Sequence, residues 1–126
     1  MGRINVRSKG ANGEREFCRW LQDTLDLGEL PERNLDQVRN GGADIMTLPQ
    51  FTIEVKRCEA LALRQWWVQV MQAATKDSQP IVAYRQNRKP WKFLISAQNI
   101  GLDKGFIEIA EFEFKKWITR IYSENK

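Results

Sequence analysis

The chain has 126 residues, 42% of them hydrophobic and 29% charged, which is enough apolar material for a compact core in a single domain over residues 1–126. It has no histidine, which excludes imidazole-based catalysis and zinc sites with histidine ligands. Two cysteines far apart in sequence predict reduced thiols and an intracellular, cytoplasmic protein. No apolar run approaches the roughly 20 residues that span a bilayer, so we expect no membrane partner. A net charge of +4 fits a polyanionic partner.

The N-terminal half predicts a helix followed by short strands. Residues 1–10 are basic with little to bury, so we expect a basic N-terminal arm. Apolar residues at helical spacing predict a helix over 11–25, which a glycine and a proline end shortly afterwards. Residues 34–39 fit a short strand before the Asn-Gly-Gly turn at 40–42.

The rest of the chain adds strands, two helices and a polar loop. The predicted elements are a hairpin of strands 44–48 and 51–56 joined at Pro49-Gln50, a helix over 62–76, strands over 81–84 and 91–95 around the basic loop 85–90, a strand over 106–109 and a closing helix over 111–122. Residues 97–126 read as a C-terminal extension. This order predicts an α/β domain with a mixed sheet.

The predicted strand 51–56 carries the main chemical signal. Its apolar residues share one face, while Glu54 and Lys56 share the other. The hairpin would bring Asp44 near both of them, and two converging carboxylates suit Mg²⁺ or Mn²⁺. A lysine beside them can orient a metal-bound water or stabilise a charged transition state. Alone, Glu54 and Lys56 fit a solvent-facing ion pair better; the combination with Asp44, the glycine turn and an upstream glutamate favours a site.

That upstream glutamate is Glu14. It falls in the middle of the apolar face of the first helix, where a carboxylate is unfavourable unless it meets a cation or a donor. We favour participation in the site over a simple interaction with the helix dipole. Glu16 falls well away from this face and is expected at the surface.

Several cations are candidate phosphate contacts. Arg39 lies five residues before Asp44, and Arg15 lies next to Glu14; for both, an ordinary solvated cation is an equal alternative. The second helix carries three glutamines that fit a solvent-exposed face: Gln65, Gln69 and Gln72. The alternative is that one of them contacts DNA or a metal-bound water. The full set of candidate DNA contacts is Arg3, Arg7, Lys9, Arg15, Arg39, Arg85, Arg88 and Lys89.

Together these features resemble the PD-(D/E)XK nuclease signature: Asp44, then Glu54-Val55-Lys56, with Glu14 on an upstream helix. Ala43 stands where the superfamily name has proline. Further blocks resemble archaeal-type and phage Holliday junction resolvases, over roughly residues 7–95 in all; these blocks are 7–16, 38–44, 53–56, 80–84 and 91–93. The segment over 28–34 is longer than the resemblance leads us to expect.

The resemblance implies a restriction-endonuclease-like mixed β-sheet flanked by helices, and a homodimer that cuts opposite strands of a four-way DNA junction with Mg²⁺. From the oxygen ligands we expect Mn²⁺ to substitute for Mg²⁺. The resemblance implies that Glu14, Asp44 and Glu54 bind metal and that Lys56 is catalytic. It also implies that Arg15 and Arg39 assist in DNA binding or cleavage. Two alternatives stay open: a phage or restriction-type nuclease for other DNA structures, and a nuclease-fold DNA-binding module without turnover.

Overall fold

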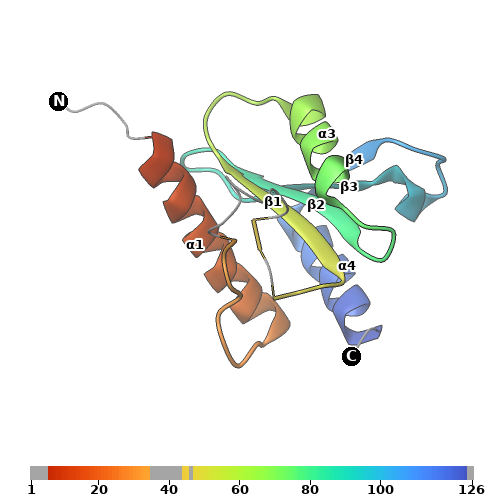
Figure 1. The fold of residues 1–126 in the computed structure, drawn as a ribbon, viewed down its shortest axis with the longest axis horizontal. Coiled ribbons are helices and arrows are strands. Elements are labelled where there is room, and N and C mark those ends of the chain that lie inside the picture. The colour runs from red at the N-terminus through yellow and green to blue at the C-terminus, as the bar shows by residue number, and fades with distance from the viewer. Residues whose placement is uncertain (1–5, 35–43, 46, 125–126) are drawn as a thin grey trace.

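The computed structural model of the chain describes residues 6–34, 44–45 and 47–124. In this part of the chain a four-stranded mixed sheet is flanked by three α-helices (Figure 1), which confirms the predicted α/β fold class. In chain order the elements are α1 (Val6–Leu25), β1 (Phe51–Arg57), α3 (Leu63–Ala73), β2 (Gln79–Arg85), β3 (Lys92–Ser96), the 3-10 helix η1 (Ala97–Ile100), β4 (Phe106–Ala110) and α4 (Glu111–Glu124).

The strand order is β1-β2-β3-β4. β1 and β2 run parallel, with Arg57 opposite Arg85 at their carboxyl ends, while β2, β3 and β4 pair antiparallel. The parallel pair requires a crossover, which α3 supplies. The last residues of β1 and β2 therefore lie side by side, and the carboxyl end of β1 carries the E-x-K sequence.

Helices cover both faces of the sheet (Figure 1). The apolar residues of β1 pack with α1 and α4, as their alternation predicts. On the other face, Trp66, Trp67 and Val70 of α3 pack against β2 and β3. Because α3 covers this second face, the polar side of β1 is also buried: Thr52 and Glu54 are 6% and 2% exposed.

Helix α1 begins at Val6, five residues before the predicted start. Residues 6–10 of the expected basic arm are therefore helical, in keeping with the good helix propensity of arginine and lysine at Arg7 and Lys9. Residues 1–5 lie outside the described residues. So do the turn at 40–42 and nearly all of the strand predicted over 34–39.

The predicted hairpin at Pro49-Gln50 is wrong. The two residues do form a turn, with Phe51 N donating to Leu48 O at 2.9 Å, but 44–48 is no regular strand in its described residues. Two-residue hairpin turns need a positive φ at the first central position, which the proline ring forbids. Ile45 instead forms an isolated antiparallel bridge with Arg33.

The predicted C-terminal extension packs closely against the rest of the domain. β4 pairs with β3 along its whole length, and the ring of Phe114 in α4 stacks on Phe93 of β3 with centroids 3.7 Å apart. Phe114 and Ile118 are fully buried. In the described part of the chain, no helix combines the length and apolar character that a bilayer crossing requires.

Candidate active site

Asp44 lies directly against β1 despite the missing hairpin. Its backbone N–H donates to Ile53 O at 2.8 Å, and its side-chain Oδ2 accepts from Val55 N at 2.6 Å. Its side chain also shares a hydrogen bond with Glu54. The two acids are 5% and 2% exposed, so the structure joins them as a buried carboxyl pair.

The two carboxyl groups affect each other's ionisation. Burial, the charge of Asp44 and the hydrogen bond between the two groups together raise the pKa of Glu54 to about 8, although the charge of Lys56 opposes the rise. A second negative charge is costly in this place unless a cation compensates it. Hard oxygen donors with uncompensated charge are the ligand chemistry of Mg²⁺ and Mn²⁺, so the pair fits a divalent ion.

Glu14 of α1 lies close enough to Asp44 and Glu54 to make a further negative charge at this pair more costly. Its own carboxylate is paired with a cation. Its Oε1 accepts from Arg33 Nε at 3.0 Å, and the two side chains are only 17% and 21% exposed. Burial raises the pKa of Glu14, followed by the charge of Asp44, while Arg33 lowers it. Among the described residues, no three acidic, cysteine or histidine side chains converge as a complete set of metal ligands. The structure thus places Glu14 near the pair, with its carboxylate on Arg33.

Lys56 lies on the same side of β1 as Glu54, as the alternation predicts. Its Nζ donates to Gln69 Oε1 of α3 at 2.8 Å. Glu54 is buried, which excludes the alternative of a solvent-facing ion pair between the two. All three glutamines considered on α3 are exposed, as a solvated face predicts, and Gln69 is the one that contacts the candidate lysine.

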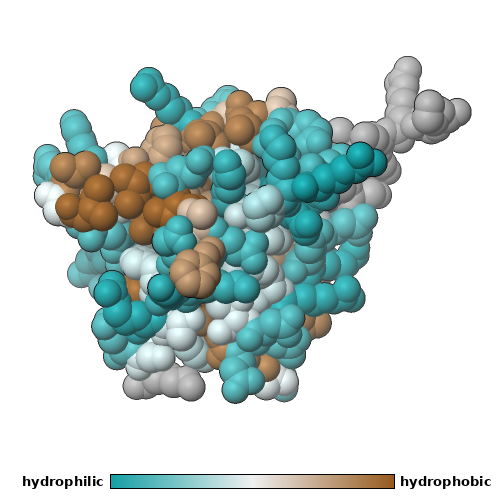
Figure 2. Space-filling model, turned by 180° about the vertical axis from the view of Figure 1, so that it is seen from behind, coloured by the Kyte–Doolittle hydropathy of each residue, from teal (hydrophilic) through white to brown (hydrophobic). Residues whose placement is uncertain are grey.

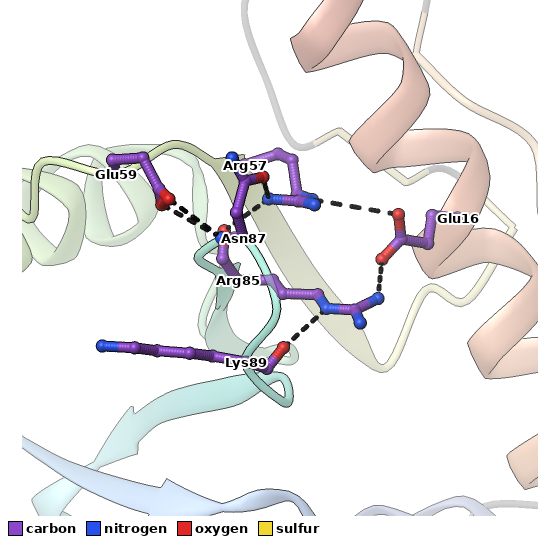
Figure 3. Close-up of polar contacts among 6 residues, drawn as sticks. All are labelled: Glu16, Arg57, Glu59, Arg85, Asn87 and Lys89. Carbon is purple, nitrogen blue, oxygen red and sulfur yellow. Dashed lines mark hydrogen bonds and ion pairs between the residues drawn. The ribbon is translucent and has the colours of Figure 1, made fainter.

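A polar network holds the loop between β2 and β3 against α1 (Figure 3). Glu16 of α1 forms ion pairs with Arg85 and, at 3.9 Å, with Arg57. Arg57 also donates to Asn87 Oδ1 at 2.9 Å, and Arg85 Nε donates to Lys89 O at 2.7 Å. Glu16 is thus not a simple surface residue, and Arg85 has a structural role whether or not it also contacts DNA.

The other predicted DNA contacts are spread over two elements. Arg15 of α1 is exposed and donates to Asn12 Oδ1 at 3.0 Å. Arg88 and Lys89 are exposed in the loop between β2 and β3. Arg7 and Lys9 belong to the first turns of α1, and their side chains lie outside the described residues, as do Arg3 and Arg39.

Some residues at the site belong to no recognisable sequence motif. Arg33 lies in an irregular segment 19 positions from Glu14, so no local sequence pattern predicts their contact. Gly13 had a usable signal, because a glycine inside a helix indicates close packing. A Cβ at this position would lie 2.6 Å from Arg57 Cβ, so the glycine allows α1 to approach the end of β1.

The fold defines the class: an α/β domain of the restriction-endonuclease-like kind, whose sheet carries the buried pair of Asp44 and Glu54. A family model described as "Phage putative PDDEXK endonuclease" matches residues 5–125, and the chain belongs to this family. The match confirms the resemblance to PD-(D/E)XK nucleases and extends it through the C-terminal segment. Comparisons with curated proteins and with solved structures gave no significant match.

Proposed function

We propose that the protein is a Mg²⁺-dependent endonuclease that hydrolyses phosphodiesters in branched DNA, as a Holliday junction resolvase does, with Mn²⁺ as a substitute. The observation that carries the proposal is the buried pair of Asp44 and Glu54, with Lys56 two residues further along β1. Family membership supports a phage nuclease acting on DNA. The junction substrate rests on the sequence blocks that resemble resolvases.

In this proposal Asp44 and Glu54 hold the divalent ion, and Glu14 as a third ligand stays a prediction. When bound, such an ion lowers the pKa of a water and offsets charge on the phosphate. Lys56 supplies a fixed positive charge that stabilises the developing negative charge or orients the attacking water. The hydrogen bond from Lys56 to Gln69 holds the ammonium group in place for this work.

The proposed DNA surface combines the exposed cations Arg15, Arg88 and Lys89 with the predicted contacts that the structure does not describe, all acting on phosphates. Arg85 contributes by holding the loop.

Paired cuts need paired sites, so we also propose a homodimer that acts inside a cell. Figure 2 shows exposed apolar side chains gathered on one face of the molecule. Exposed apolar residues of α3 and of the segment around η1 are candidates for the dimer surface; they are Val68, Met71, Ile100 and Leu102. Light scattering tests the oligomeric state, and a monomer at working concentration would contradict the homodimer.

The test of the proposed function is a panel of end-labelled duplex, flap, Y-form and four-way junction substrates, each incubated with Mg²⁺, Mn²⁺, Ca²⁺ or excess EDTA. We expect paired cuts in the junction with Mg²⁺ or Mn²⁺, and binding without cutting in Ca²⁺. Asp44→Asn serves as the inactive control. Preferred cutting of flaps or ends would favour another phage or restriction-type nuclease. Binding with no cut in any substrate would favour a DNA-binding module, and full activity in EDTA would refute the metal site.

A further inference from the structure

Arg33 occupies a defined place beside the candidate active site. Its Nε donates to Glu14 Oε1 at 3.0 Å, and its side chain is 21% exposed, so part of the side chain remains reachable from solvent. In the described residues, this is the only carboxylate with which Arg33 forms an ion pair.

The backbone around Arg33 is clamped to the segment that carries Asp44. Arg33 and Ile45 form an antiparallel bridge, and Asn34 N donates to Asp44 O at 2.8 Å. On the other side, Glu32 N donates to Thr47 Oγ1 at 3.1 Å. Asp44 in turn donates to Ile53 O of β1. Two successive backbone contacts therefore fix Arg33 relative to the strand that carries Glu54 and Lys56.

The guanidinium group of Arg33 has N–H donors beyond the one that Glu14 accepts. It carries five N–H donors in one plane, of which Glu14 takes one through Nε. Its terminal amino groups donate no hydrogen bond to another described residue. Arginine suits acceptors with two oxygens in a plane, such as carboxylates and phosphates. A carboxylate that already fixes the guanidinium plane reduces the side-chain entropy lost when a ligand binds.

We propose that Arg33 is a substrate-binding residue that donates its terminal amino groups to a backbone phosphate of DNA next to the Asp44–Glu54 pair, and that Glu14 orients it. The inference rests on the proposed nuclease function and deepens it. It assigns a phosphate contact to a residue outside every motif, and it gives Glu14 a positioning role as the alternative to its predicted place among the metal ligands.

The test measures DNA binding separately from cleavage. Affinity for a labelled four-way junction is titrated over a range of KCl with Ca²⁺ held constant, for the wild type, Arg33→Ala, Arg33→Gln and Arg33→Lys. The matched control is Arg120→Ala, which removes an arginine that is 67% exposed on α4. We expect Arg33→Ala and Arg33→Gln to bind roughly tenfold more weakly and to lower the slope of log affinity against log salt by about 1.

Two variants separate this role from a structural one. Glutamine keeps a donor for Glu14 but no charge for a phosphate, so Arg33→Gln should melt near the wild-type temperature and still bind DNA weakly. Arg33→Lys should restore the salt slope but not the full affinity. If Arg33→Ala does not fold, the glutamine and lysine variants carry the comparison. Wild-type affinity and slope in Arg33→Gln would overturn the inference.

Glu14 provides the second arm of the test. If it acts through Arg33, Glu14→Gln leaves the Mg²⁺ concentration for half-maximal cleavage unchanged, and its effect on DNA affinity is not additive with that of Arg33→Ala. A raised Mg²⁺ requirement in Glu14→Gln would make Glu14 a metal ligand and overturn the inference. Failure of the proposed function looks different: the wild type would bind DNA with Arg33 dependence yet cut no substrate.

Discussion

Replacing Glu54 with glutamine should stabilise the protein while abolishing cleavage. Glu54 is 2% exposed and faces Asp44, and burial together with the Asp44 carboxylate raises its pKa from 4.5 to about 8. A glutamine has nearly the same shape and can donate its amide N–H to Asp44, but it never ionises. The variant therefore keeps the packing and the hydrogen bond and loses the unfavourable charge.

The magnitude follows from the two pKa values. Below pH 4.5 Glu54 is protonated in the folded and in the unfolded chain, so it costs nothing. Between pH 4.5 and about 8 the unfolded chain releases the proton and the folded chain keeps it. Stability then falls by up to about 1.4 kcal/mol for each pH unit, and the fall ends above the folded pKa. Over the whole window Glu54 costs about 3–5 kcal/mol.

The assay is thermal or urea unfolding in EDTA at several pH values from 4 to 9, for the wild type and Glu54→Gln. The two should coincide near pH 4, and the variant should be more stable near pH 9 by about 3–5 kcal/mol, or roughly 10–20 °C in melting temperature. Glu29→Gln, at an exposed position, is the control and should show no such divergence. A difference between wild type and Glu54→Gln that does not change with pH would refute the buried pair of Asp44 and Glu54.

Three further predictions follow from the site and its surroundings. Lys56→Ala should keep near wild-type thermal stability and DNA binding but lose about a hundredfold or more in single-turnover cleavage, with poor rescue by arginine; a normal rate would remove Lys56 from the chemistry. Gly13→Ala should lower the free energy of unfolding by about 1–3 kcal/mol, because its Cβ would lie 2.6 Å from Arg57 Cβ, whereas Gly28→Ala, with no atom within 4 Å, should be near neutral in urea unfolding. Replacing both Arg88 and Lys89 with alanine should lower the salt slope of DNA binding by about 2; an unchanged slope would remove the loop from the DNA surface.

Local patterns predicted most of the elements and the composition of the site. Alternation in β1 placed Glu54 and Lys56 on one side and the apolar residues on the other, because the side-chain period of a strand is set by the backbone alone. Helical spacing predicted α3 and α4 and the residues they bury, Phe114 and Trp67 among them. The turn between β2 and β3 was likewise predictable from its polar, proline-containing sequence.

Tertiary structure decided how these pieces meet. The polar face of β1 is buried because the parallel pairing with β2 brings α3 across it, so Glu54 acquired a raised pKa that strand alternation does not imply. Asp44 reaches β1 through one backbone hydrogen bond to Ile53 and one that its side chain accepts from Val55 N, rather than through a hairpin. Glu14 meets Arg33, and Glu16 meets Arg85, over 19 and 69 positions. Such contacts depend on where loops return to the sheet, and a periodic pattern contains no information about that.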